Sequence, residues 1–543
     1  MSRQLNMLEK SIFCKFRNKF PLLKLFKINN LIYMYDAKSN LLTEVSLEEL
    51  RVIYDYYVNN CEDKIALYLK DLFLRNICLP GPLIKIVPDK DEINYMIKSQ
   101  IDEYIPRKLM IEITESCTLR CNYCFYTNQI DTKRKHSERK MDEKIAFKAI
   151  DYYYSQYTQS LNQIDSKYWT KIIEEIPPYL SWWGGEPLLN FNLIIKTKNY
   201  IESLDWSKYH IDKNKIIYVI STNLTVLNKE ILHFLIDNNV NLLISLDGAK
   251  EEHNKNRKYK NGKGSFDKVI RNLNTIISSY PNYAKENIVI QPVLADNINP
   301  NRALSFLEEY FNLNKSNQKI LTILPSLQRN EFEFLPKKSF SNLTNSKMQT
   351  EFRSELKSIS KLSEIQLDEL LRNNKTLYLR LKEILRLENN VCFDNPFGSD
   401  YKSLTFSCPL GIDTLFVSIN GDIHSCCKVD HSFPIGNINY GLDENSLQKV
   451  YYSYYKEIEK NCSKCWIIEF CKICPALVCW GGKFFLPSSI ECKQIRKNIS
   501  QLFIKYIILS TEFEDLYLHL QTYYSQHYEN RFDSVPVSLK DFK

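Results

Sequence analysis

Three cysteines constrain this chain more than any other feature. Cys117, Cys121 and Cys124 follow the spacing C-x3-C-x2-C, directly after a strand-like run at 109–114. Three thiolates on one short loop can hold three irons of a four-iron, four-sulfur cluster, whereas a structural zinc or an electron-carrying cluster normally takes a fourth protein ligand. The fourth iron would then be open to a small molecule. The alternative is a zinc knuckle that a distant His or Cys completes.

This triplet resembles the signature of the radical S-adenosylmethionine (radical SAM) enzymes. In that family the methionine amino and carboxylate groups of SAM chelate the open iron, and reduction cleaves SAM to a 5′-deoxyadenosyl radical. The resemblance implies two cofactors, a SAM-binding [4Fe-4S] cluster and S-adenosyl-L-methionine. It also implies an electron donor such as a flavodoxin or ferredoxin.

Strand-like and helical patterns alternate from about 105 to 330. Strands are predicted at 108–114, 179–183, 216–221, 241–246, 287–294 and 319–325, and helices near 141–158, 191–204, 227–238, 265–279 and 301–312. Such βα repetition predicts an α/β fold, with a parallel sheet curled into a partial (β/α)6 barrel. Chemistry is then expected at the carboxyl ends of the strands, and the cysteine loop stands there.

A glycine doublet ends the second predicted strand. The run Trp182-Trp-Gly184-Gly185-Glu186-Pro187 stands in a chain with only 13 glycines, which indicates that the backbone there must approach a ligand closely. It is similar to the GGEP motif of radical SAM enzymes, and the resemblance assigns Glu186 to the SAM amino group. The alternative is a tight turn capped by Glu186.

Further SAM contacts are predicted at the ends of the next strands. Ser221-Thr-Asn223 and Ser245-Leu-Asp-Gly248, followed by His253 and Arg257, look like further motifs of the family. The resemblance implies that Asn223 and Ser245 contact ribose and that Arg257 binds the SAM carboxylate. It also places Tyr123 against adenine. Each motif taken alone would more often be a turn or a helix cap.

A second group of cysteines lies near the carboxyl end. It resembles the SPASM domain, which carries two auxiliary [4Fe-4S] clusters in peptide-modifying radical SAM enzymes; two zinc sites are the alternative. By that resemblance the nearer cluster takes Cys408, Cys426 and Cys474, with Cys392 or a substrate thiolate completing it. The farther cluster takes Cys462, Cys465, Cys471 and Cys492. Cys427 and Cys479 are spare and could substitute for one of these ligands.

Cys427 also separates two groups of relatives. Anaerobic sulfatase-maturating enzymes place an acid at this position, where it can accept a substrate proton, and Asp430 stands three residues further on. No catalytic base is therefore assigned. Cys427 occupies the position of that acid and is a candidate catalytic residue. This departure favours a peptide cross-linking enzyme over formylglycine formation.

The remaining segments complete five predicted parts. Residues 1–100 form an α+β module with a hairpin at 31–45 and a capping box from Ser46 to Glu49. This module resembles leader-peptide recognition elements; the alternative is a plain cap packed on the barrel. The other parts are the barrel at 105–330, a linker with a long helix (347–388) at 331–390, the SPASM domain at 391–495, and a helix (497–527) with a tail at 496–543.

Bulk composition narrows the class of protein. No run reaches the ~20 apolar residues of a membrane span, and charges at Lys10, Lys15 and Arg17 interrupt any secretory signal. Clustered cysteines in an unexported chain indicate metal rather than disulfides, which predicts a reduced cytoplasm. The formal charge of +8 falls when cysteines ionise on clusters, so neither nucleic acid nor membrane is expected as a partner.

Together these patterns predict a radical SAM peptide maturase. It would abstract a hydrogen from a precursor peptide or protein and install a thioether or carbon–carbon cross-link. One alternative is an anaerobic sulfatase-maturating type of enzyme, which forms formylglycine. The other is a non-catalytic iron-sulfur electron carrier or scaffold.

Overall fold

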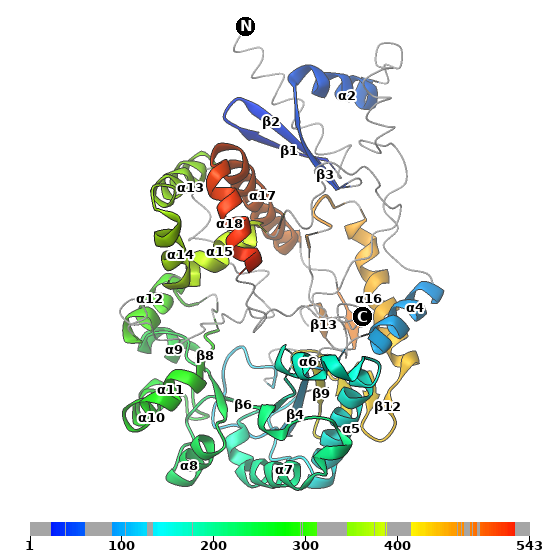
Figure 1. Ribbon diagram of the computed structural model, residues 1–543, viewed down its shortest axis with the longest axis vertical. Coiled ribbons are helices and arrows are strands. Elements are labelled where there is room, and N and C mark those ends of the chain that lie inside the picture. Colours follow the sequence, from blue (N-terminus) through cyan, green and yellow to red (C-terminus); the bar gives the residue numbers. More distant parts are fainter. Residues whose placement is uncertain are drawn as a thin grey trace.

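The structure is a computed structural model (Figure 1). It describes residues 23–37, 40–59, 90–103, 105–126, 134–175, 177–293, 295, 297–311, 345–373, 375–385, 387, 414–463, 465–468, 470–471, 478–480, 482–485 and 489–526. The predicted sixth barrel strand at 319–325 lies outside these residues, as do Cys392, Cys408 and Cys474.

A parallel sheet forms the centre of the fold. Its strands β4 (Lys108–Thr114), β5 (Tyr179–Gly184), β6 (Ile217–Thr222), β7 (Asn241–Ile244) and β8 (Ile288–Ile290) lie in this order and pair in parallel. Five of the six predicted strands are therefore confirmed. Adjacent carboxyl ends meet at one edge of the sheet, which is where the predicted site residues follow their strands.

The sheet continues across the predicted SPASM boundary. Strand β9 (Thr414–Val417) pairs in parallel with β4, and Met110 stands opposite Phe416. The antiparallel strands β10 (Asp422–His424), β11 (Gly436–Asn437) and β12 (Gly441–Leu442) extend the same sheet to nine strands. The beginning of the cysteine-rich region is thus an extension of the central sheet.

Helices cover one face of this sheet, because alternate strand residues such as Ile111, Leu180 and Ile220 are apolar and fully buried. The predicted helices form, and three of them start at a side-chain cap; for example, the Asp142 carboxylate accepts from the Lys144 backbone N–H. They are α5 (Glu143–Leu161), α7 (Phe191–Ser203), α8 (Lys229–Asp237), α10 (Phe266–Ser279) and α12 (Pro300–Tyr310). Shorter helices fill the connections: α6 (Trp169–Glu175), α9 (Lys250–Asn256) and α11 (Pro281–Asn287).

The amino-terminal module is a three-stranded antiparallel sheet followed by a helix. The predicted hairpin is β2 (Leu31–Asp36) and β3 (Leu41–Val45), and an unpredicted strand β1 (Leu23–Ile28) pairs with β2. The capping box is confirmed, since the Glu49 N–H donates to Ser46 Oγ and the Ser46 N–H to Glu49 Oε2. Helix α2 (Leu47–Asn59) starts there.

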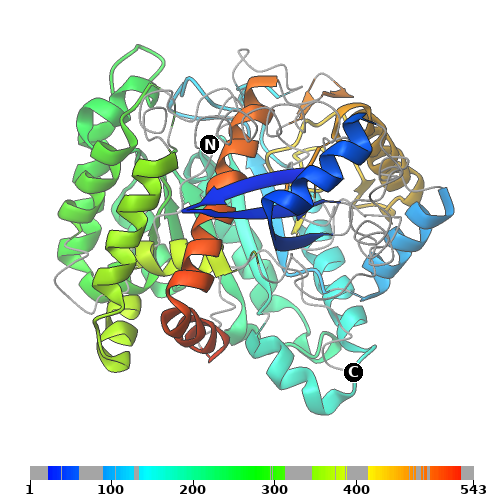
Figure 2. The same cartoon turned by 90° about the horizontal axis from the view of Figure 1, so that it is seen from above.

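The three-stranded sheet packs on carboxyl-terminal helices. Phe26 stacks on Phe503 at 5.1 Å between ring centroids, and Tyr35 lies 4.9 Å from the same ring. Seen from above, β1 and β2 cross α17 (Ser489–Glu512) (Figure 2). The cap-on-the-barrel alternative is therefore wrong for this sheet, because its aromatic face meets α17. Helix α4 (Lys90–Glu103), which also lies largely within residues 1–100, does pack with the barrel core through Ile93 and Ile97.

Two predicted long helices are broken. The predicted helix at 347–388 is instead α13 (Asn345–Ile359), α14 (Glu364–Asn373) and α15 (Lys375–Leu385). A break before α14 is stabilised because Ser363 and Gln366 exchange side chain to backbone hydrogen bonds. The predicted helix at 497–527 is α17 and α18 (Glu514–Gln526). Each break lets an apolar face turn back onto one shared core.

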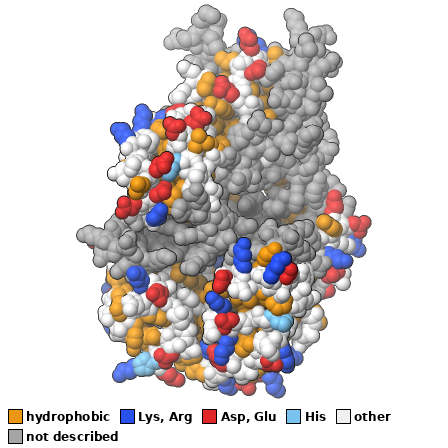
Figure 3. Space-filling model, in the orientation of Figure 1, with side chains coloured by type: hydrophobic (Ala, Val, Ile, Leu, Met, Phe, Trp, Pro, Cys, Tyr) orange, Lys and Arg blue, Asp and Glu red, His pale blue; other side chains and the backbone are white. Residues whose placement is uncertain are grey.

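The remaining described α-helices and strands are two long helices and two short strands. They are α4 (Lys90–Glu103), α16 (Glu444–Cys462), β13 (Cys479–Trp480) and β14 (Lys483–Phe484). None of the described helices is long and apolar enough to span a bilayer. On the face shown in Figure 3, acidic and basic side chains are interspersed over the described part of the surface, as on an ordinary solvated surface.

Candidate active site

The cysteine loop lies at the carboxyl end of β4 and is held by backbone hydrogen bonds. The Arg120 N–H donates to the Lys258 carbonyl at 2.7 Å, and the Asn122 N–H donates to the Asn256 carbonyl at 3.2 Å. These bonds join the loop to the segment after α9. The loop is thereby fixed between the first and fourth parallel strands.

The three thiols of this loop share one largely buried environment. Burial raises the pKa of the Cys121 thiol to about 12, and it also raises the pKa values of Cys117 and Cys124. Each neighbouring thiolate would raise the pKa of Cys117 further, so the three sulfurs are electrostatically coupled. Such a group ionises when metal cations supply positive charge.

The donors around these sulfurs fit a metal-bound thiolate. The Leu119 N–H lies 3.4 Å from Cys117 Sγ, and Asn223 Nδ2 lies 3.5 Å from it. Among the described residues, no three His, Cys, Asp or Glu side chains lie where they could share a single metal ion. A four-iron cluster does not require its ligands to share one metal ion, because each cysteine binds its own iron.

The glycine doublet is explained by an approach between two backbones. A Cβ on Gly185 would lie 2.3 Å from the Ser116 carbonyl oxygen, and one on Gly184 would lie 2.2 Å from the Thr114 oxygen. The Gly185 and Glu186 N–H groups donate to those same oxygens, each at 2.8 Å. The backbone that closely approaches the glycine doublet is thus the end of β4, which leads into the cysteine loop.

Glu186 is fully buried and makes internal hydrogen bonds. Its carboxylate accepts from the Leu188 N–H at 3.2 Å, from the Thr222 hydroxyl at 2.8 Å and from the Asn223 N–H at 2.8 Å. Burial raises its pKa to about 7. The capped-turn alternative therefore describes this residue, and a contact between Glu186 and SAM stays a prediction.

Asn223 links the third parallel strand to the cysteine loop. Its amide nitrogen donates to Thr118 Oγ1 at 3.2 Å, and its amide oxygen accepts from the Thr225 N–H at 2.9 Å. Ser245 is half-buried beyond the adjacent strand β7, and its N–H donates to the Thr222 carbonyl at 3.0 Å. Both residues therefore lie at the predicted edge of the sheet.

Asp247 organises the predicted adenine and carboxylate contacts. Its buried carboxylate accepts from the Tyr123 hydroxyl, from Arg257 Nε at 2.9 Å and from the Val293 N–H at 2.8 Å. The Arg257 guanidinium carbon lies 5.2 Å from the centroid of the Tyr123 ring. In the sequence Asp247 stands out only as part of a motif, and its role as the shared partner of Tyr123 and Arg257 depends on the tertiary structure.

Four carboxyl-terminal cysteines also share one environment. Burial raises the pKa of Cys462 to about 12, and nearby Cys465 and Cys492 raise it further. Burial and the same neighbours raise the pKa of Cys471 as well. The structure therefore brings together the four residues predicted for the farther auxiliary cluster, and Arg496 Nη1 lies 3.8 Å from Cys465 Sγ.

Cys426 and Cys427 lie on a separate loop after β10. The Cys427 thiol donates toward Cys426, which lowers the pKa of Cys426 and raises that of Cys427. Asp430 is fully buried, and its carboxylate accepts from the Ser432 N–H at 2.9 Å and from the Gly482 N–H at 3.2 Å. Asp430 thus stabilises this loop.

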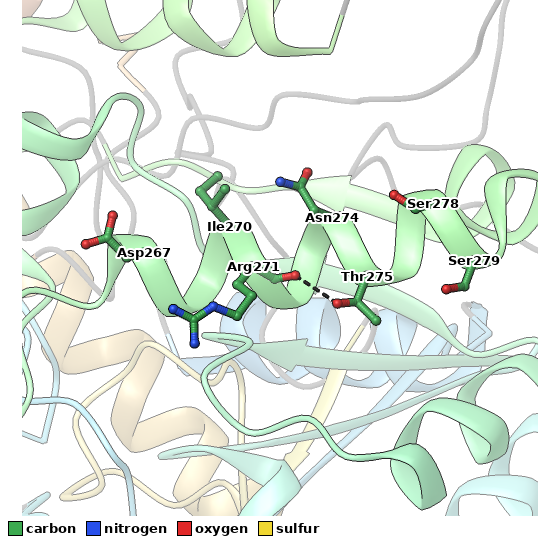
Figure 4. A pocket seen from close by; sticks show the side chains of 7 residues that line it. All are labelled: Asp267, Ile270, Arg271, Asn274, Thr275, Ser278 and Ser279. Atoms are coloured by element: carbon green, nitrogen blue, oxygen red, sulfur yellow. Dashed lines mark hydrogen bonds between the residues drawn. The ribbon is translucent and has the colours of Figure 1, made fainter.

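A surface pocket lies on α10, and its side chains spread along that one helix (Figure 4). Seven residues line it: Asp267, Ile270, Arg271, Asn274, Thr275, Ser278 and Ser279. None of these seven is a predicted site residue. The pocket is therefore separate from the cysteine loop.

Comparison with known proteins agrees with this geometry. Residues 111–299 match the model of the Radical SAM superfamily. The match covers about a third of the chain, and this segment is similar to radical SAM enzymes. The matched segment contains the cysteine loop, the glycine doublet and the Asp247 network, so the radical SAM [4Fe-4S] cluster and SAM are its cofactors.

Similar proteins include sulfatase-maturating enzymes. The chain is 28% identical over 160 residues to a serine-type anaerobic sulfatase-maturating enzyme of Bacteroides thetaiotaomicron, which covers 30% of this chain and 34% of that enzyme. It is 28% identical over 342 residues to an uncharacterized protein of Methanocaldococcus jannaschii, covering 63% of this chain and 91% of that protein.

Among solved structures, the chain is similar to native anSMEcpe with bound AdoMet and a peptide. The identity is 19% and the TM-score 0.46, with 76% of this chain and 99% of that chain covered.

Proposed function

We propose that this protein is a radical SAM peptide maturase that installs a thioether or carbon–carbon cross-link in a precursor peptide or protein. One observation carries the proposal. Besides the cysteine loop at the carboxyl edge of the sheet, a second set of cysteines comes together at Cys462, Cys465, Cys471 and Cys492. A second iron-sulfur centre could accept the electron that the product radical must lose before the new bond closes.

When bound, the cluster and SAM supply the 5′-deoxyadenosyl radical that removes a hydrogen atom from the substrate. This chain's residues hold and shield these groups. Cys117, Cys121 and Cys124 would bind three irons, while Asn223 and Ser245 would contact ribose. The loops at the carboxyl edge would exclude water from the reacting atoms.

The auxiliary centres would act as electron acceptors. Cys462, Cys465, Cys471 and Cys492 would hold the farther one. Cys426 would contribute to the nearer one, with Cys408, Cys474 and Cys392 as its other proposed ligands. A flavodoxin or ferredoxin would supply electrons to the first cluster, in a reduced cytoplasm.

Formylglycine formation is the second candidate, because sulfatase-maturating enzymes are among the relatives. That reaction needs a base that accepts a substrate proton. At the corresponding position this chain has Cys427, and the nearby Asp430 carboxylate already accepts hydrogen bonds from Ser432 and Gly482. These contacts favour cross-linking.

Enzymatic activity is tested by incubating the full chain, reconstituted anaerobically with iron and sulfide, with SAM and dithionite. We expect 5′-deoxyadenosine from the parent protein, none from Cys121→Ala, and parental amounts from Cys479→Ala. If the parent protein forms none even with candidate peptides, the non-catalytic electron carrier becomes the better explanation.

The type of product is tested by mass spectrometry of short cysteine-containing peptides encoded beside the gene. Cross-linking removes two hydrogens from the peptide, whereas formylglycine formation from cysteine removes two hydrogens and also exchanges the sulfur, which leaves as hydrogen sulfide, for an oxygen from water. A cross-linked product resists sequencing across the new ring, whereas an aldehyde product fragments normally and reacts with hydrazines. An aldehyde would overturn the cross-link proposal.

A further inference from the structure

A buried arginine joins the radical SAM sheet to the loop that carries Cys426. Arg134 is only 1% exposed. Its guanidinium carbon lies 5.6 Å from the Tyr126 ring, 5.3 Å from the Trp183 ring and 5.2 Å from the Phe416 ring. These rings come from the cysteine loop, from β5 and from β9, so one cation contacts three parts of the site.

The guanidinium donors all point toward the loop after β10. Nε donates to His431 Nε2 at 2.7 Å, Nη2 contacts the same nitrogen, and Nη1 donates to the Cys427 carbonyl oxygen. His431 must therefore accept at Nε2 and carry its proton on Nδ1. The His424 ring stacks on His431 at 4.4 Å and 13°, which fixes the orientation of the acceptor.

A buried cation requires a nearby opposite charge. Glu112 on β4 is fully buried, and although burial raises its pKa overall, it lies close enough to Arg134 that the guanidinium lowers this pKa. Its carboxylate accepts from the Tyr126 hydroxyl and from the Ile419 N–H at 3.2 Å. Glu112 therefore connects β4 and the cysteine loop that follows it to the β9–β10 turn, which is about 300 residues away in sequence.

We propose that Arg134 is a positioning residue that fixes the Cys426–Cys427 segment against the inner face of the radical SAM sheet. Lysine cannot replace it, because one ammonium group cannot donate in a planar fork to His431 and to the Cys427 carbonyl while stacking between aromatic rings. The assignment of Cys426 as an iron ligand rests on the proposed function. The contacts of Arg134 do not depend on it.

Hydrogen exchange on the full chain tests the positioning role. We expect exchange at 426–432 to become about tenfold faster or more in both Arg134→Lys and Arg134→Gln. Exchange in α8 serves as the internal control for global unfolding. The matched variant Arg302→Gln removes an exposed partner of Glu251 and should leave exchange at 426–432 unchanged. A smaller increase at 426–432, or an equal increase in α8, overturns the proposal.

A potentiometric titration followed by electron paramagnetic resonance adds a second readout. The signal to follow in the reconstituted protein is the one that Cys426→Ala abolishes. We expect its reduction potential to fall in Arg134→Gln, because a nearby cation stabilises the reduced centre, and to stay closer to the parent value in Arg134→Lys. An unchanged potential in Arg134→Gln counts against the proposal. If the parent protein lacks a Cys426-dependent signal, the proposed function of Cys426 fails, while hydrogen exchange still decides the role of Arg134.

Discussion

The substitution Gly185→Ala tests whether the glycine doublet serves the cysteine loop. An added Cβ would lie 2.3 Å from the Ser116 oxygen, 2.8 Å from the Ser116 carbonyl carbon and 2.9 Å from the Glu115 oxygen. All three are backbone atoms next to Cys117, so rotation of a side chain cannot relieve the overlap. Relief requires the loop to shift, at a cost of about 1–3 kcal/mol of stability.

The assay compares this variant with Gly262→Ala. Gly262 has a φ of +83° and open space where a Cβ would point, so alanine there adds only backbone strain of about 1–2 kcal/mol. We expect Gly185→Ala to lose iron from the first cluster, measured by iron content and by SAM-dependent spectra, while Gly262→Ala retains it. Parental iron content and SAM binding in Gly185→Ala would refute the reasoning.

Three further predictions concern titration, metal binding and loop stability. Burial lowers the pKa of His253 to about 4, so the unfolded chain binds more protons between about pH 6.5 and 4, and stability falls as the pH decreases through that window by up to about 3 kcal/mol. Denaturant titrations across this range should show a smaller pH dependence in His253→Gln than in the parent protein; equal slopes would contradict this. Cys465→Ala should lower iron content by about one four-iron cluster, whereas Cys479→Ala should not, and equal iron content in the two variants would exclude Cys465 as a ligand. Asp430→Asn should cost about 1–3 kcal/mol in chemical unfolding because hydrogen-bond acceptors are lost, yet retain 5′-deoxyadenosine formation; a stable variant that still cleaves SAM but no longer modifies peptide would instead indicate a base.

Much of the central fold could be predicted from the sequence, because hydrophobic periodicity and capping residues are local signals. The strands around Ile111, Leu180 and Ile220 were predicted from apolar runs, and these side chains are fully buried under helices. The capping box from Ser46 to Glu49 formed as its spacing indicates. Interruptions within long helical patterns were missed, since a break such as that at Ser363 depends on which core the apolar face must reach.

Local patterns also located the cysteine loop and the ends of the strands where the site lies. They could not reveal how these segments meet. Only the tertiary structure placed the carboxylate of Asp247 between Tyr123 and Arg257, the oxygens of Glu186 against Thr222 and Asn223, and the guanidinium of Arg134 between β5 and the Cys427 carbonyl. The physical reason is the sequence separation of the interacting residues. Cysteine spacing is a local signal within one short loop, whereas the partner of a buried charge is set only when strands that are distant in sequence pack together.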